Sequence, residues 1–163
     1  MSFGTFQVLN PGDQCYRRNR CVLPDSILRP SASNALEQGE WLNPNVSDSH
    51  SFERYGAADS GPTVSYPVAA RRGSTDVQSL GKTELYMSWV EAMTTTYDST
   101  SLAQVAPGAP LKVSQIDIDG ENFSILALAD TSGDHVVAEI LEPPTTPASY
   151  TEMRIRNVRY DLP

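Results

Sequence analysis

The chain has 163 residues, enough for one domain of ordinary size or for one compact domain with extended appendages. Its hydrophobic content of 39% lies below the roughly 45–50% of average globular proteins, so we expect a modest core and a substantial irregular share. The formal net charge of −8 argues against binding to nucleic acid or to an anionic membrane by the chain as a whole.

No stretch approaches the roughly 20 apolar residues of a membrane span, and the residues after Met1 do not begin a signal peptide. We therefore expect a soluble protein that is made in a cytoplasm. Of its 12 basic residues, ten are Arg, and Arg is enriched where proteins touch one another. This ratio favours a contact surface, although codon bias in a GC-rich genome explains it equally well.

Residues 1–34 hold short apolar patches separated by Pro11-Gly12, Pro24 and Pro30, without a sustained period. Such a segment buries little by itself, yet it is too apolar for a disordered tail. We expect an extended N-terminal arm that docks on another surface, and residues 35–163 then form the domain. The alternative is a loop packed on its own domain.

Residues 35–42 read as a turn into a strand, with Leu36, Trp41 and Leu42 as core candidates. Residues 43–63 are rich in Asn, Ser, Asp, Gly and Pro, and they are predicted to form a long loop. Residues 63–68 alternate as a strand does, and Pro67 places that strand at a sheet edge.

Residues 84–97 fit two patterns. Leu85, Trp89 and Met93 match a helical face, whereas Leu85, Met87 and Trp89 match a strand. The run ends in three threonines and a tyrosine, which favour β structure, so we predict a strand.

Residues 111–141 are the most evenly patterned part of the chain. Apolar residues alternate from Leu111 to Ile125, and a denser apolar block follows from Val136. The pattern is broken by Asp119-Gly120 and by a turn cluster over residues 130–134, so we predict three or four short antiparallel strands. The fold class is therefore all-β, a small antiparallel barrel or sandwich with long loops.

After a Pro-rich connection, residues 150–156 form the final predicted strand, with Met153 and Ile155 inward and Arg154 and Arg156 outward. The apolar parity changes at Asn157, because Val158 and Tyr160 carry the apolar face beyond it, and a β-bulge there would reconcile the two halves of the strand.

His135, with Ser132 and Asp134, supplies the residue types of a hydrolase triad. Neighbouring residues on a strand point to opposite faces, so Asp134 is badly placed to orient His135, and a hairpin turn is the better interpretation. His50 has no partner at a recognisable spacing, and we interpret it as a solvated loop residue. We expect no enzyme and no cofactor.

Two further motifs are weak. Residues 117–122 partly match a calcium-binding loop but lack its full set of oxygen ligands, so a hairpin turn explains them better. Cys15 and Cys21 supply only two of the about four ligands of a zinc site, and we favour two free thiols over a small disulfide loop. We therefore expect no metal site.

Four segments, taken in order, resemble the head decoration, or cement, proteins of tailed bacteriophages. They are Ala35 to Leu42, then Tyr66-Pro67-Val68 with Arg72-Gly73 and Asp76-Val77-Gln78, then Gly108 to Val113, and finally Ser132 to Ala138. In that family a glycine-led strand, a "G-x-x-L-x-V" entry and a late "G-D-x-V-V" hairpin recur in a small β-barrel.

The resemblance implies a non-enzymatic virion protein on the capsid exterior, made in the host cytoplasm, that binds the major capsid protein and bridges its subunits. It implies a homo-oligomer, with a trimer favoured and a dimer as the other option, and neither nucleic acid nor membrane as a direct partner. The arm is the candidate capsid contact, where basic side chains face acidic groups and apolar ones bury area. Its candidate residues are Phe3, Phe6, Val8, Leu9, Arg17, Arg18 and Arg20.

Two other functions stay open. A phage tail or head–tail connector protein also uses β-barrels with extended arms, but at a different copy number per particle. A small hydrolase or metal-dependent enzyme would use His50 and His135.

Overall fold

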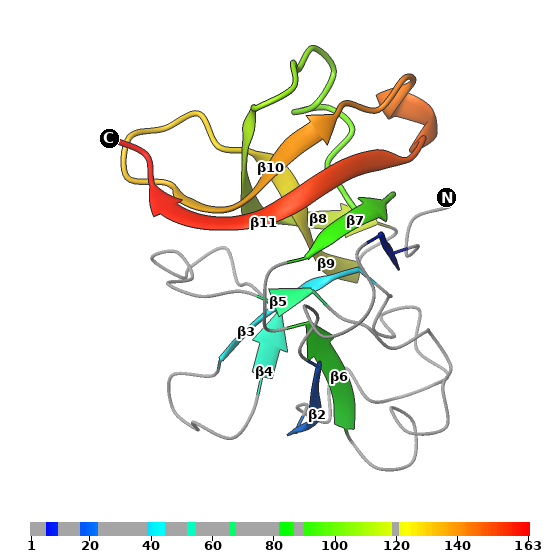
Figure 1. The fold of residues 1–163 in the computed structure, drawn as a ribbon, viewed down its shortest axis with the longest axis vertical. Coiled ribbons are helices and arrows are strands. Elements are labelled where there is room, and N and C mark those ends of the chain that lie inside the picture. Colours follow the sequence, from blue (N-terminus) through cyan, green and yellow to red (C-terminus); the bar gives the residue numbers. More distant parts are fainter. Residues whose placement is uncertain are drawn as a thin grey trace.

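The computed structural model describes residues 6–9, 17–22, 39–44, 52–54, 66–67, 82–86, 90–118 and 121–163. These residues form strands in three sheets, joined by turns and a single 3-10 turn at Pro147–Ser149. In Figure 1 the largest sheet lies above the other two. The chain is thus all-β over its described part, as predicted.

The largest sheet has six strands, and each pairs antiparallel with its neighbours. In spatial order they are β1 (Phe6–Val8), β7 (Glu91–Thr94), β11 (Met153–Asp161), β10 (His135–Glu142), β8 (Pro110–Ile118) and β9 (Glu121–Leu128).

The other two sheets are small. One pairs β2 (Arg17–Val22) with β6 (Lys82–Tyr86). The other has β3 (Trp41–Pro44) in the centre, flanked by β4 (Phe52–Arg54) and β5 (Tyr66–Pro67).

The predicted strands of residues 111–141 are confirmed as β8, β9 and β10. β8 and β9 pair without interruption from Leu111↔Leu128 to Ile118↔Glu121, which leaves two residues for their connection. That length is the one expected for Asp-Gly between two alternating runs. The hairpin is thus determined by local sequence.

The carboxylate of Asp134 stabilises the turn before β10. Asp134 accepts hydrogen bonds from the backbone N–H groups of Asp130 and Thr131, at 3.1 and 3.0 Å. Gly133 has a φ of +86°, which a glycine adopts without strain. The prediction of a turn over residues 130–134 is therefore confirmed.

β11 contains the predicted bulge. Val136 pairs with Tyr160 and Ala138 with Asn157, so β11 has one residue more than β10 over this stretch. Before the bulge, Met153 and Ile155 are fully buried, whereas Arg154 and Arg156 face outward. The bulge and the directions of these four side chains are confirmed, but Tyr160, which was expected on the apolar face, is exposed.

The core combines the six-stranded sheet with residues from the N-terminal half. Phe6 and Trp41 join the cluster formed by the apolar face of the sheet. Its other buried members are Val90, Ala92, Tyr97, Leu102, Leu111, Val113, Leu126, Val137, Ala138, Ile140, Met153 and Ile155. Trp41 and Leu42 are completely buried, as predicted, and Leu36 lies outside the described residues.

Two expectations need revision, and a third is confirmed for the residues that the structure describes. β4 lies inside residues 43–63 and pairs with β3, so this stretch is not only a loop. Residues 84–97 are not one strand, because β6 and β7 belong to different sheets. The strand expected over residues 63–68 is described only at Tyr66–Pro67, and it lies at the edge of its sheet, as Pro67 indicated.

The pairing of strands leaves the six-stranded sheet open, with β1 and β9 at its edges. The chain beyond β7 nevertheless reaches β9, where Tyr97 and Leu126 form an isolated parallel bridge. Asp98 N–H donates to the Leu126 carbonyl at 2.7 Å, and Leu126 N–H donates to the Thr96 carbonyl at 3.3 Å. The segment after β7 is thus joined to the edge strand β9 by these two hydrogen bonds.

Candidate functional site

The outward face of β7, β11 and β10 carries a row of paired charges. We call this row the ionic ladder, and its members are Glu91, Glu139, Glu142, Arg154 and Arg156. Antiparallel register places Glu139 opposite Arg156 and Glu142 opposite Arg154. Opposite charges that face each other across strands stabilise the sheet modestly.

Arg154 joins three strands. Its guanidinium donates to Glu91 on β7 at 3.0 Å and to Glu142 on β10 at 3.1 Å. The hydrogen bonds that Arg154 donates to these carboxylates, the one to Glu91 first, raise the pKa of Arg154 above its ordinary value. Arg154 therefore stays charged and fixes the outward face of the sheet.

Arg156 and Tyr160 share a carboxylate. Arg156 donates to Glu139 Oε2 from two nitrogens, at 3.1 and 2.8 Å, and the Tyr160 hydroxyl donates to Glu139 Oε1 at 3.1 Å. Burial, followed by the contact with Glu139, raises the pKa of Tyr160. Tyr160 is 41% exposed, one of two large apolar side chains on the described surface that are exposed.

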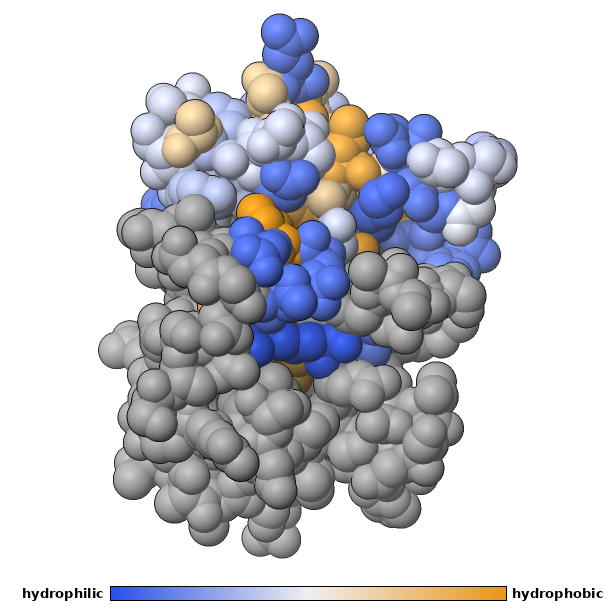
Figure 2. All heavy atoms as spheres, turned by 180° about the vertical axis from the view of Figure 1, so that it is seen from behind, coloured by the Kyte–Doolittle hydropathy of each residue, from blue (hydrophilic) through white to orange (hydrophobic). Residues whose placement is uncertain are grey.

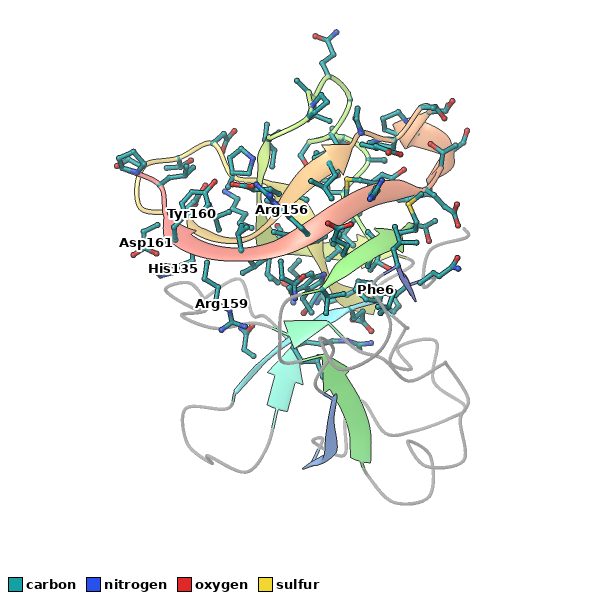
Figure 3. The ribbon with its side chains drawn as sticks, viewed as in Figure 1. Phe6, His135, Arg156, Arg159, Tyr160 and Asp161 are labelled. Carbon is teal, nitrogen blue, oxygen red and sulfur yellow. The ribbon has the colours of Figure 1, made fainter. Side chains whose placement is uncertain are left out.

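The end of β11 is fixed to the start of β10. His135 Nδ1 contacts Asp161 Oδ1, and the two residues lie opposite each other in the register of β10 and β11. Figure 3 shows them side by side, with Arg159 leaving β11 on the side opposite to Tyr160. Arg159 is therefore not a member of the ionic ladder.

Asp134 and His135, two residues of the possible hydrolase triad, bond to other partners. Asp134 receives a 2.9 Å bond from Lys112 as well as its two backbone bonds, and His135 pairs with Asp161 instead. Burial alone would raise the pKa of Asp134, but the bonds from Lys112, Thr131 and Asp130 outweigh it and lower that pKa. Ser132 is exposed in the turn, so the three do not form a relay.

A second charged cluster, largely buried, lies against β9. Glu40 is fully buried and accepts from Arg54 Nε at 2.8 Å and from Arg54 Nη2 at 2.9 Å. The Arg54 guanidinium lies 4.9 Å from the centre of the Phe123 ring. Ser124 N–H donates to the same carboxylate at 3.1 Å, so this cluster joins the N-terminal half to β9.

The predicted arm residues fall into three groups. Phe6 is 4% exposed in the core, Val8 packs against that core, and Leu9 is 38% exposed. A capsid contact through the Phe6 ring would therefore require β1 to leave its sheet. Arg17, Arg18 and Arg20 belong to β2, whose backbone pairs with β6, and their side chains lie outside the described part.

Other residues singled out in the sequence are not described. Phe3, Cys15 and His50 lie outside the described residues. Residues 119–120, which connect β8 and β9 in the segment compared above with a calcium loop, also lie outside them. Asp117 and Asn122, on either side of that connection, are both exposed. The prediction of free thiols and the capsid-contact role of Phe3 stay predictions.

Glu139, Tyr160 and the Glu40–Arg54 pair were not singled out from the sequence. The available signal for the ladder was the alternation Arg154-x-Arg156 opposite Glu139-x-x-Glu142, but it becomes visible only once the strands are paired. Glu40 gave no signal, since a charged residue next to a tryptophan is ordinarily exposed.

Figure 2 shows hydrophilic residues over much of the described surface, with smaller apolar areas between them. Among the described residues, no group of three His, Cys, Asp or Glu side chains is placed to hold a metal ion. No helix in that part of the chain has the length and apolar character needed to cross a membrane. Comparison with family models, with curated proteins and with solved structures found no match.

Proposed function

We propose that the chain is a non-enzymatic structural protein of a tailed bacteriophage that decorates the outer surface of the assembled head. In this role it binds the major capsid protein and bridges neighbouring subunits as a homo-oligomer, with a trimer favoured. It would be made in the host cytoplasm and end in the virion.

The observation that carries the proposal is the position of the motifs that resemble decoration proteins. Gly39 precedes β3, the stretch from Gly108 to Val113 leads into β8, and the stretch from Ser132 to Ala138 is the turn into β10. Each of these three motifs therefore lies at the start of a strand that contributes buried residues. This placement agrees with motifs that specify a shared fold.

The finer architecture belongs to the same proposal. The bridge between Tyr97 and Leu126 supports a small barrel in which the sheet closes through the segment after β7. A small β-body in which the segment after β7 is hydrogen-bonded to β9 suits a protein that has to keep its shape under load from a DNA-filled shell.

The ionic ladder supports a surface for protein contact without catalysis. Its arginines are held by carboxylates from neighbouring strands, which lowers the entropy lost when such side chains are ordered at an interface. Arg and Tyr are also enriched among residues that dominate binding energy. Repeated weak contacts on a symmetric shell would then add through avidity.

The first experiment is to count this protein in purified particles of the phage that encodes it. Hundreds of copies per particle, released together with capsid subunits, are expected for a decoration protein. A count near six, or copies found only on isolated tails, would instead identify the tail or connector alternative. Absence from particles would refute both.

The arm assignment is tested separately with shells that lack the protein. Arg17, Arg18 and Arg20 are replaced together by Glu in the full chain, and binding to the shells is measured by co-sedimentation. Loss of binding with unchanged circular dichroism is expected. Undiminished binding would remove these arginines from the contact, and the matched control R154E/R156E asks whether the ladder contributes.

A further inference from the structure

The outward face of the six-stranded sheet has its charges sorted by strand. The ladder side chains on β11 are both basic, Arg154 and Arg156, and those on β10 are both acidic, Glu139 and Glu142. β11 and β10 are neighbours in the middle of the sheet, where Figure 1 shows them side by side. A basic stripe therefore lies next to an acidic stripe.

Both stripes are accessible to a partner. The side chains of Arg154, Arg156 and Glu142 are 36, 45 and 64% exposed, and Glu139 lies beside the exposed Tyr160. The contacts among the described residues also leave hydrogen-bonding groups available. Arg156 donates to Glu139 from Nε and Nη2 and keeps Nη1, while Glu142 accepts at Oε1 and keeps Oε2. The stripes can therefore form further ion pairs without losing those of the ladder.

The register of the two strands makes this face complementary to itself. Arg154 lies opposite Glu142 and Arg156 opposite Glu139, so the stripes form two rows. A two-fold axis that runs along the strands between β10 and β11 brings a second copy face to face with the first. It places β11 of each copy over β10 of the other and leaves each row in its place. Arg154 then faces Glu142 of the second copy, and Arg156 faces Glu139 of the second copy.

The charge pattern also selects one orientation of the second copy. A two-fold axis across the strands would lay β11 over β11 and exchange the two rows. Arg154 would then face Arg156 of the second copy, and Glu139 would face Glu142. Like charges placed against each other oppose binding, so only the axis along the strands is favoured.

The expected dimer is weak and reversible. Desolvation largely offsets the attraction of buried ion pairs, and the net charge of −8 makes two copies repel each other. The arginines are, however, already held by carboxylates of the ladder, which lowers the entropy lost on binding. Tyr160 and the alkyl parts of the two arginines add apolar area.

We propose that the outward face of β10 and β11 binds a second copy of this chain, face to face about a two-fold axis along the strands. The basic stripe of each copy contacts the acidic stripe of the other. The proposal concerns the chain in solution and does not rest on a role in a phage head.

The test uses two charge reversals in the full chain, R156E and E139R. In a dimer of R156E, carboxylates meet across the interface in this row, and in a dimer of E139R, guanidinium groups meet there. The mixture of the two variants restores both contacts. The introduced carboxylate then faces the introduced guanidinium, and the remaining Glu139 of one copy faces the remaining Arg156 of the other.

Net charge separates the proposal from simple repulsion between acidic molecules. Reversal of one charge shifts the net charge by two units, so R156E has −10 and E139R has −6 instead of −8. Repulsion between whole molecules predicts that E139R associates more tightly than the wild type, whereas the proposal predicts the opposite. D130R is the matched control, because it also has −6 but Asp130 lies outside the ladder and is 67% exposed.

Sedimentation velocity over a hundredfold range of concentration measures the association of each protein. The wild type should form a reversible dimer, and R156E and E139R should each associate at least about tenfold more weakly, because like charges meet twice in each dimer. Their equimolar mixture should associate about as tightly as the wild type, and D130R at least as tightly. Circular dichroism and thermal unfolding check that each variant is folded.

A wild type that stays monomeric over this range would overturn the proposal. E139R that associates as tightly as D130R would overturn it as well, since net charge rather than the face would then decide. The same holds for a mixture that associates no more tightly than its two components, because Arg156 and Glu139 would then not meet across the interface. If either variant fails to fold, R154E and E142R in the other row give the same comparison.

Discussion

The hydroxyl of Tyr97 donates a 2.7 Å hydrogen bond to the carbonyl oxygen of Thr151, 54 residues further along the chain. Tyr97 is completely buried, and its ring lies 5.6 Å from that of Tyr150. This contact joins the segment after β7 to the start of β11. It fixes the place where the chain returns to the centre of the sheet.

Replacing Tyr97 by Phe should destabilise the protein by about 1 kcal/mol, because the partly buried carbonyl of Thr151 loses its donor. The ring and its packing stay. Urea denaturation at neutral pH measures the change. Tyr150→Phe is the matched control, and an equal loss in both variants would show that the bond from Tyr97 has no special weight.

The same residue predicts a pH dependence. Burial raises the pKa of Tyr97 from 10.0 to about 12, so the folded state keeps its proton where the unfolded state loses it. The stabilisation is fully present below pH 10 and should be lost between about pH 10 and 12. The stability of Tyr97→Phe should fall less over this range, which denaturation curves at several pH values would show. Parallel curves for the two proteins would contradict the shift.

Among the three glycines that the structure describes, Gly39 is the one where a side chain should do most harm. A Cβ there would lie 2.8 Å from Thr96 Oγ1 and 3.1 Å from Phe6 Cβ, and its φ of +86° already disfavours other residues. Gly39→Ala should therefore cost at least about 1 kcal/mol more than backbone strain alone. Gly108→Ala is the control, because its φ of +88° is similar but no atom lies within 4 Å. Equal melting temperatures for the two variants would show that the space beside Gly39 can open.

Asp134→Asn should destabilise the protein at neutral pH but not in acid. The pKa of Asp134 is lowered below 3.8, so its charge stabilises the folded state above that value and the effect disappears as the pH falls through the folded-state pKa. Thermal unfolding of wild type and variant at pH 7 and in strong acid measures the difference. Asp130→Asn is the control, since Asp130 lies 3.8 Å from Lys112 and is 67% exposed. A difference that persists in acid would have to come from lost hydrogen bonds instead.

The pair of Glu139 and Arg156 should contribute little to stability. Arg156 is 45% exposed, and exposed ion pairs typically give about 0.2–1 kcal/mol. A double-mutant cycle with E139Q and R156Q should yield a coupling within that range, smaller still in 1 M salt. A coupling of several kcal/mol would mean that the ladder, rather than the core, holds β10 to β11.

Local patterns predicted the local structure well. The hairpin of β8 and β9, the turn at Asp134 and the bulge after Asn157 follow from alternation, turn residues and a change of parity within a few positions. β4 was missed because Phe52–Arg54 is too short to show a period. Its pairing with β3 depends on contacts that no local pattern records.

Contacts between residues far apart in the chain could not be predicted from the sequence. Phe6 belongs to a segment interpreted as an arm, but the sheet accepts it because Gly39 leaves room beside Thr96 for its ring. Glu40 reads as a surface charge until Arg54 and Ser124 are placed around it. Sequence could supply the residue types at these positions but not the partners that decide their roles.

The order of strands also constrains how the protein is made. β11 begins only at Met153, yet it lies between β7 and β10 in the middle of the six-stranded sheet. The strand β11 must therefore have left the ribosome before β7, and β1 beside it, can pair with the rest of the sheet. Until then the apolar side chains of β8, β9 and β10 stay exposed to solvent. Synthesis at high yield should therefore depend on chaperones or on rapid synthesis of the last strand.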